Sequence, residues 1–471
     1  VGNQCNSSGG GAYISTLASC VLSNNTASLG GGVFGGTTAD SLISSNRASV
    51  AGGGAYSNTM NHCVLVANFC GNTGGGAYAS SLTSCVLSNN SAGSGGAVYF
   101  GTITDSLISS NRAAISGGGA YSNILTRCIL VTNTALQGGG TYLGTLFNCS
   151  LTNNRATGGT GGGSYQGTIS NSVYFGNWAY NAGGGTELAT LYNCYLISNS
   201  TAYNQDGGVY GGVLYNCLLR GNAGGEDNAT LYNCTLVQNS ANVGGGVFGG
   251  KLLNCIVYYN SAPNGSNWLQ SPVMSNCCTV PLPPGGGNFT NAPIFVDLAN
   301  SDFHLQPNSP CINAGKNAFV SVGADLDGLA RIAGGTVDVG AYEYPTPASM
   351  LSYVWLLQNG LPIDGSTDSA DTDSDGMSNY AEWKTGTSPT NASSVLQLAS
   401  PVPTNSMSGP AGMVITWQSV PGVPYFIQRS SNLGGGFSTL QSNLPGQSGQ
   451  TTFTDTTATN TGPYFYRVGV P

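Results

Sequence analysis

The apolar positions of residues 1–280 follow a fixed pattern, L-x-x-C-x-L-x-x-N, as in "LASCVLSNN" at 17–25. The pattern returns about every 22 residues together with a glycine cluster. A coil of this length is too short for a βαβ unit, and glycine and β-branched residues break it up too often for helices. Short strands joined by turns are the remaining possibility. If the coils stack at about 4.8 Å, the sequence predicts a parallel β-solenoid of about 12 coils.

An asparagine lies five residues after each position of the cysteine column, twelve times in succession. An asparagine at a turn adopts the left-handed conformation readily, and its amide can hydrogen-bond to the next asparagine in the stack. We therefore expect a buried asparagine ladder. Its members are Asn25, Asn46, Asn68, Asn90, Asn111, Asn133, Asn154, Asn177, Asn199, Asn222, Asn239 and Asn260. The glycine clusters are expected at another corner, where a positive φ or close backbone approach excludes a Cβ.

The cysteine column includes most of the 14 cysteines. Serine replaces cysteine at positions 41, 106 and 172, which favours buried free thiols over a disulfide ladder. Cys5 lies outside the column, near the start of the sequence. It is a candidate for a thiol linked between subunits, with Cys277, Cys278 or Cys311 as its partner.

An aromatic residue follows most glycine clusters and forms a second column. It includes Tyr13, Phe34, Tyr56, Tyr78, Tyr99, Tyr121, Tyr142, Tyr165, Tyr210 and Phe248, with Glu187 in the same position once. The rings could point inward as core or outward as a stripe that binds sugars or a partner, and the sequence leaves both open.

The low charge content and the negative net charge of the chain restrict the classes of partner that it can bind. Only 6% of the 471 residues are charged and the formal net charge is -8, which argues against nucleic acid. No run of 18 apolar residues predicts a transmembrane segment. Because the sequence begins with Val1 and shows no signal peptide, we expect a processed chain that is secreted or displayed at the cell surface.

The combination of "GGGAY" with "LSNN" resembles the GGA and FxxN repeats of bacterial polymorphic outer-membrane proteins. This resemblance covers about residues 1–280. It implies a right-handed parallel β-helix and adhesion more than catalysis. Leucine-rich repeats share the L-x-x-C-x-L-x-x-N motif, but they would need further leucines where this chain has glycines.

Residues 281–345 resemble the end segment of secreted bacterial β-helix proteins, through "SDFHLQPNSPCINAGKN" and "DLDGLARIAGGTVDVGAYEY". The resemblance implies that they close the C-terminal end of the solenoid. His304 lies here with no carboxylate or cysteine set evident beside it in the sequence, so we expect a structural histidine.

Residues 346–394 hold a linker and a calcium motif, "DTDSDGMSNYAE". The spacing fits a loop in which carboxylates and one backbone carbonyl surround Ca²⁺, while Gly376 permits the sharp turn. The predicted ligands are Asp371, Asp373, Asp375, Met377 through its carbonyl, Asn379 and Glu382, with Asp364 and Asp368 as candidates for a second ion.

The flanks of this motif resemble thrombospondin type 3 and dockerin motifs. Residues 395–471 alternate apolar and polar positions between turn signals, as in "MVITWQSV" and "YFYRVGV". They are similar to a small fibronectin type III β-sandwich.

Catalysis by a polysaccharide lyase or hydrolase would need clustered carboxylates or a basic group beside an ion. Arg47 and Arg112 share a column but lie three coils apart. Glu226, Asp227 and Arg220 form one local group, which we attribute to a loop with its own salt bridge. The sequence therefore predicts no catalytic residues.

The leading hypothesis is an extracellular structural protein that assembles head to tail into a fibre, because the ladder spacing already includes Asn3 and no cap is evident before it. The alternative is a monomeric adhesin or glycan-binding protein that uses the aromatic column. A polysaccharide or a cell surface is the expected partner in that case.

Overall fold

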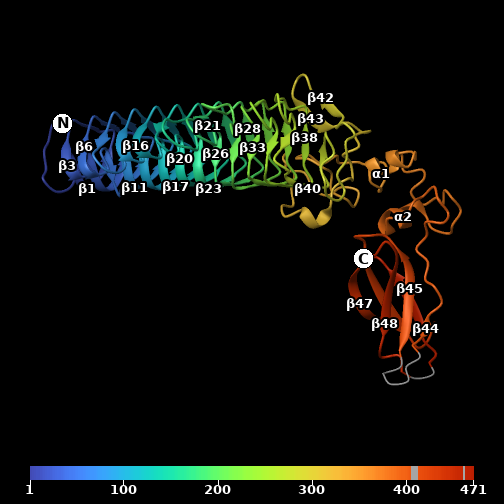
Figure 1. Cartoon of the computed structure of the whole chain (residues 1–471). Coiled ribbons are helices and arrows are strands. Elements are labelled where there is room, and N and C mark those ends of the chain that lie inside the picture. Colours follow the sequence, from blue (N-terminus) through green and yellow to red (C-terminus); the bar gives the residue numbers. More distant parts are fainter. Residues whose placement is uncertain (405–411, 460–461) are drawn as a thin grey trace. The chain divides into compact units, whose positions relative to one another are not determined.

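The computed structural model describes residues 1–404, 412–459 and 462–471. It is almost entirely β, and the chain divides into unit 1, Val1–Thr346, and unit 2, Pro347–Pro471. Unit 1 contains a parallel β-solenoid of about 12 turns, as predicted (Figure 1). The first nine coils contribute strands to three parallel sheets and the later coils to two, so the leucine-rich-repeat alternative is wrong.

Sheet I has 19 strands, because some coils contribute two short strands to it. Its strands are β1 (Ala12–Ala18), β4 (Val33–Ala39), β7 (Ala55–Tyr56), β8 (Thr59–Asn61), β11 (Ala77–Thr83), β14 (Val98–Thr104), β17 (Ala120–Thr126), β20 (Thr141–Phe147), β23 (Ser164–Ser170), β26 (Thr186–Glu187), β27 (Thr190–Tyr192), β30 (Val209–Tyr210), β31 (Val213–Tyr215), β33 (Glu226–Asp227), β34 (Thr230–Tyr232), β36 (Val247–Phe248), β37 (Lys251–Leu253), β39 (Trp268–Leu269) and β40 (Val273–Ser275).

Sheet II has 13 strands and sheet III has nine. Sheet II consists of β2 (Val21–Ser23), β5 (Leu42–Ser44), β9 (Val64–Val66), β12 (Val86–Ser88), β15 (Leu107–Ser109), β18 (Ile129–Val131), β21 (Ser150–Thr152), β24 (Val173–Phe175), β28 (Tyr195–Ile197), β32 (Leu218–Arg220), β35 (Thr235–Val237), β38 (Ile256–Tyr258) and β41 (Cys278–Thr279). Sheet III consists of β3 (Thr26–Leu29), β6 (Arg47–Ala51), β10 (Phe69–Cys70), β13 (Ser91–Ser94), β16 (Arg112–Ser116), β19 (Thr134–Ala135), β22 (Arg155–Ala156), β25 (Trp178–Ala179) and β29 (Ser200–Thr201).

The asparagine ladder is present as predicted. Each ladder side chain accepts a hydrogen bond from the backbone N–H of the preceding ladder residue, as Asn154 Oδ1 does from Asn133 N at 3.0 Å. The ladder continues beyond its predicted end, because Asn260 donates to Asn267 Oδ1. The expected left-handed backbone is wrong by one position: the residue before each ladder asparagine has the positive φ, such as Thr132 at 54°. That turn aims the following asparagine into the core.

The glycine clusters form a corner of the coil, and both expected reasons apply: a positive φ and a close backbone approach that excludes a Cβ. The first glycine of most clusters has a positive φ, for example 69° at Gly52. The second glycine has no room for a side chain, because a Cβ on Gly53 would lie 2.4 Å from the carbonyl oxygen of Gly75. Larger residues are therefore excluded along this corner.

The cysteine column faces the core, and its cysteines are free thiols, as the sequence favours. The other four cysteines, Cys5, Cys70, Cys278 and Cys311, are free thiols as well. The structure also explains the exchange with serine. Cys63 Sγ donates to the carbonyl of Asn61, two residues earlier, and Ser41 Oγ donates to the equivalent carbonyl of Ala39. The two side chains are therefore interchangeable at this position.

Residues 281–345 do more than close the end of the solenoid. Residues 285–289 continue the stack, with Phe289 bridged to Cys278. The rest, with β42 (Phe295–Asp297), β43 (Asp302–Leu305) and η1 (Asn317–Phe319), folds back along the side of the last coils. It contacts them through bonds such as Asn216 Nδ2 to Ala324 O and Ala341 N to Thr235 Oγ1.

Unit 2 begins with α1 (Tyr353–Gln358) and α2 (Asn379–Thr385). Two three-stranded antiparallel sheets follow, β44 (Val402–Pro403), β45 (Met413–Ser419) and β48 (Gly449–Asp455) in one, and β46 (Pro424–Ser430), β47 (Ser438–Pro445) and β49 (Phe465–Gly469) in the other. Ile415, Trp417, Tyr425 and Ile427 form their common core. This is a small β domain, and its likeness to fibronectin type III stays a prediction.

Candidate functional sites

The predicted calcium loop brings three aspartates together before α2. One carboxylate oxygen from each of Asp371, Asp373 and Asp375 lies within 4.8 Å of the others. Gly376, with φ 94°, makes the sharp turn that the motif requires. Ser378 then caps α2 by accepting a hydrogen bond from Ala381 N, which fixes the direction in which the helix leaves the loop.

The loop has more carboxylate oxygens than the chain satisfies. Both oxygens of Asp373, Oδ2 of Asp375 and both oxygens of Glu382 are buried with no hydrogen-bond partner among the described residues. Burial, reinforced by the three aspartates, raises the pKa of Glu382 to about 7. Uncompensated buried carboxylates are costly, and a hard cation with oxygen ligands is the group that would neutralise these. The residues present therefore fit Ca²⁺.

The other predicted ligands are less well supported. Asn379 directs its amide elsewhere, since Nδ2 donates to Thr367 O and Oδ1 accepts from Thr372 Oγ1. Asp364 accepts from Ser366, and Asp368 accepts from Ser349 Oγ and Met350 N. The structure thus does not group Asp364 and Asp368 with the aspartate triad.

The aromatic column faces outward, which settles its orientation. Tyr13 is 57% exposed, and the following rings are half-exposed. From Tyr13 to Tyr165 the eight rings stack face to face, with centroids 4.5–5.6 Å apart and planes within 14° of each other. Their faces are therefore covered by neighbouring rings, and their rims and hydroxyl groups meet solvent.

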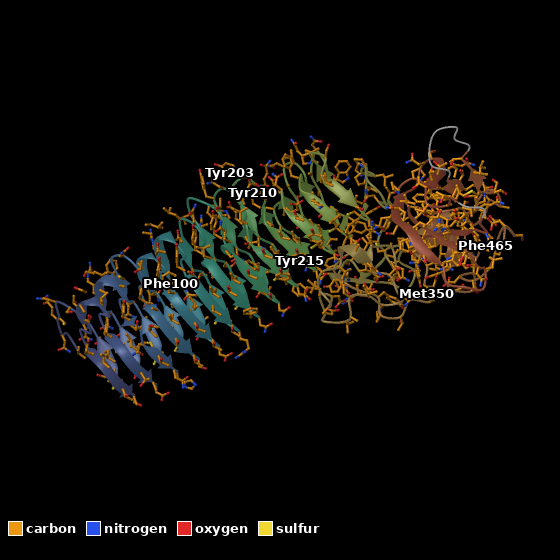
Figure 2. All side chains as sticks on the ribbon, turned by 90° about the horizontal axis from the view of Figure 1, so that it is seen from below. Phe100, Tyr203, Tyr210, Tyr215, Met350 and Phe465 are labelled. Atoms are coloured by element: carbon orange, nitrogen blue, oxygen red, sulfur yellow. The ribbon has the colours of Figure 1, made fainter. Side chains whose placement is uncertain are left out.

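Two features of this surface were not predicted. Tyr192, Tyr215 and Tyr232 form a second outward stack at 4.9 Å, which the repeated "LYNC" motif could have indicated. Asp227 also occupies the aromatic column, because it pairs with Tyr210 on one side and Phe248 on the other. Figure 2 shows Tyr210 and Tyr215 among the side chains that project from the solenoid.

The expected salt bridge around Glu226 is absent from the described ion pairs. Glu226 points into the core, is 1% exposed, and accepts a hydrogen bond from Ala229 N. Desolvation by burial raises its pKa well above the usual range. Arg220 instead contacts Gln238 and the ring of Phe303.

His304 is also placed differently from the sequence expectation, because two carboxylates hold its ring. Nδ1 lies 2.5 Å from Asp302 Oδ1 and Nε2 lies 2.6 Å from Asp327 Oδ2. Asp327 is 23 residues away in sequence, and the fold-back of residues 281–345 brings it here. Burial lowers the pKa of His304, but these two hydrogen bonds outweigh burial and raise the pKa above its ordinary value.

We expect His304 to titrate above about 6.5, its ordinary pKa, in the folded protein. A histidine with a raised pKa contributes its stabilisation fully below the unfolded pKa, and the contribution is lost as pH rises through the folded pKa. NMR titration of the imidazole measures this, with H62Q assigning the signal, since the chain has two histidines. D327N should lower the titration midpoint of His304. A midpoint at or below about 6.5 in the parent protein would contradict the pairing of His304 with the two carboxylates.

Cys5 keeps a half-exposed thiol, which donates to the carbonyl of Ser8. Its three suggested partners, Cys277, Cys278 and Cys311, are completely buried. A disulfide between one of them and Cys5 of another subunit would require the fold to open around the buried thiol, and the pairing stays a prediction.

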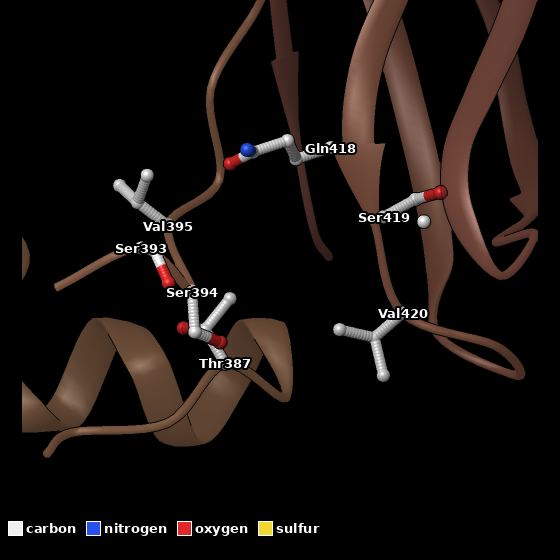
Figure 3. Close-up of a pocket in the computed structure, with 8 residues that line it drawn as sticks. Thr387, Ser393, Ser394, Val395, Gln418, Ser419 and Val420 are labelled. Atoms are coloured by element: carbon white, nitrogen blue, oxygen red, sulfur yellow. The ribbon is translucent and has the colours of Figure 1, made fainter. Parts of the chain in front are cut away.

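A shallow depression in unit 2 is lined by polar side chains together with Val395 and Val420, from the segment after α2 and from the end of β45 (Figure 3). Thr387, Ser394 and Ser419 are among them, and none of the lining residues is titratable near neutral pH. Ser419 Oγ is engaged with Thr451 and Gln447, and Ser394 Oγ accepts from Ser388 N. The depression offers no group for acid–base catalysis.

No protein-family model matches the chain, and a search of curated proteins found no match. No helix in the described part of the chain is both long and apolar enough to cross a membrane. The resemblance to polymorphic outer-membrane proteins therefore depends on the repeat motif alone.

Proposed function

We propose that this protein is an extracellular adhesion protein without enzymatic activity, in which the solenoid displays rows of side chains to a polysaccharide or a cell surface. The observation that carries the proposal is the register of its outward side chains: from Tyr13 to Tyr165 each coil places an aromatic ring beside the next. A ligand built from repeated units meets the same group at each coil, and many weak contacts add up to useful avidity.

The stacking of the rings limits how the aromatic column can contact a sugar ligand. A sugar that stacks on a ring needs a free ring face, and here neighbouring rings cover the faces. The column offers tyrosine hydroxyls as hydrogen-bonding groups and otherwise stiffens the outer surface of sheet I. Adhesion through this column would therefore depend on hydroxyl groups more than on ring faces.

A test of the proposal is retention on insoluble polysaccharides and bacterial cell walls, measured by depletion from solution. We expect binding that saturates, and no release of reducing or unsaturated sugar ends over long incubation. Released ends would favour the lyase or hydrolase class, and no retention on any of these surfaces would contradict adhesion.

Head-to-tail assembly is the second candidate function. Within the described chain β1 pairs only with β4, and β2 only with β5. Backbone groups on their other side would be satisfied by a further coil, and a second copy of the chain is one source of it. Sedimentation of the same preparations distinguishes the candidates, since assembly requires a mass that rises with concentration.

A further inference from the structure

The residues that follow the first nine ladder asparagines form an outward row on sheet III, which we call the arginine row. In register, from one coil to the next, it contains Thr26, Arg47, Phe69, Ser91, Arg112, Thr134, Arg155, Trp178 and Ser200. The three arginines are exposed, and Phe69 is 37% exposed. The row thus combines cationic, aromatic and hydroxyl groups along one straight line.

These arginines have no acidic partner. The strands of sheet III contain no aspartate or glutamate, and none of the ion pairs between described side chains involves Arg47, Arg112 or Arg155. Arg127, in contrast, is paired with Asp105 at 2.7 Å on another face of the solenoid. In a chain with net charge -8, sheet III is therefore a locally cationic face.

Aromatic rings hold two of the guanidinium groups. Arg47 lies 4.3 Å from the centroid of Phe69, and Arg155 lies 4.0 Å from that of Trp178. A guanidinium supported on a ring keeps its N–H groups available for bidentate bonds to an anion. Beside Trp178, Tyr180 is 44% exposed, and Tyr203 (Figure 2), 53% exposed, packs against Tyr180.

Shallow depressions lie at both ends of the row. The first is lined by Gln4, Asn6, Thr26, Ser28, Arg47 and Ser49. The second lies past Ser200, and its lining includes Asn204, Ser240 and Asn242. Amide and hydroxyl groups of this kind donate and accept hydrogen bonds to sugar hydroxyls.

We propose that the arginine row binds a linear anionic polysaccharide, with its carboxylate or sulfate groups on Arg47, Arg112 and Arg155 and its sugar rings beside Phe69 and Trp178. The inference rests on the proposed adhesive function and names its ligand class. Arg47 and Arg112 are three coils apart, about 14 Å, and Arg112 and Arg155 two coils, about 10 Å. Such spacing suits a chain that carries its charges on separate sugar units.

The same spacing argues against nucleic acid. Duplex DNA carries one negative charge about every 1.7 Å along its axis, far denser than the cations of this row. The net charge of -8 would repel a polyphosphate over the rest of the surface. A sparsely charged glycan avoids most of that repulsion.

The test compares binding to polygalacturonate, dextran sulfate, uncharged dextran and oligo-dT by affinity electrophoresis. The parent protein should bind an anionic glycan more tightly than dextran, and salt should weaken the binding. R112Q/R155Q should lower the affinity about tenfold or more, and W178A by about two- to tenfold. Preference for polygalacturonate or dextran sulfate identifies carboxylate or sulfate as the recognised group.

The matched control is R127Q/K251Q, which removes the same charge from other faces of the solenoid and should retain binding. If both double variants lose the same affinity for the anionic glycans, the arginine row is not the binding site. Equal binding of dextran and the anionic glycans would overturn the inference but leave adhesion intact, whereas no binding to any glycan or cell wall would contradict adhesion itself. Binding of oligo-dT with the same arginine dependence would overturn the glycan assignment. An unchanged thermal midpoint confirms that each variant folds.

Discussion

Replacing Asn133 with alanine is expected to lower the free energy of unfolding of the solenoid by about 3–5 kcal/mol, because it leaves several buried polar groups unpaired. Asn133 is fully buried. Its Oδ1 accepts from the backbone N–H and the Nδ2 of Asn111, and its own Nδ2 donates to Ile108 O and to Asn154 Oδ1. The alanine side chain replaces none of these four bonds, and only the bond from the backbone N–H of residue 133 to Asn154 Oδ1 remains.

The change would be measured as a shift of the urea denaturation midpoint. Asn61→Ala is the matched control, because Asn61 is an exposed asparagine in β8 of the same solenoid. Its substitution should change stability by less than about 0.5 kcal/mol. If N133A and N61A unfold at the same urea concentration, the ladder does not contribute the stability that its geometry indicates.

Calcium is expected to stabilise unit 2 by about 1.5–2.5 kcal/mol when it is present at ten to fifty times its dissociation constant. The physical reason is the set of buried carboxylate oxygens on Asp373, Asp375 and Glu382 that lack hydrogen-bond partners. The cation offsets their mutual repulsion and their desolvation. Calorimetry with calcium and then with excess chelator measures the shift of the thermal transition that belongs to unit 2.

Asp373→Asn should abolish most of this shift, whereas Asp364→Asn should retain it, because Asp364 is bonded to its own neighbour Ser366. Isothermal titration also gives the number of ions. We expect one ion per chain at the triad; a second ion lost in D364N would instead support the additional site at Asp364 and Asp368. A thermal midpoint that does not respond to calcium would contradict the site.

The proposed glycan-binding row is a local concentration of positive charge that the net charge of the whole chain does not reveal. The chain as a whole is acidic, yet Arg47, Arg112 and Arg155 gather on one face. The signal was present in the sequence, because each of these arginines directly follows a ladder asparagine. An alignment of the residues that directly follow the ladder asparagines predicts the arginine row, including Phe69 and Trp178.

The sequence by itself determined the coil period, the asparagine ladder and the buried thiol column. This is possible because a solenoid converts sequence period into spatial stacking: equivalent positions in successive coils are neighbours whatever else the chain does. A different signal, the spacing of acidic residues within a span of 12 residues, predicted the calcium motif, because the candidate ligands of such a loop are close together in the sequence.

Only the tertiary structure decided which way the aromatic column faces and what surrounds His304 and Glu226. The direction of a side chain depends on the turn before it, and a one-residue difference reverses it, as the left-handed residue before each ladder asparagine illustrates. The pairing of His304 with Asp327 depends on how residues 281–345 fold back over the coils. Contacts of that kind follow no period, so no pattern along the chain could predict them.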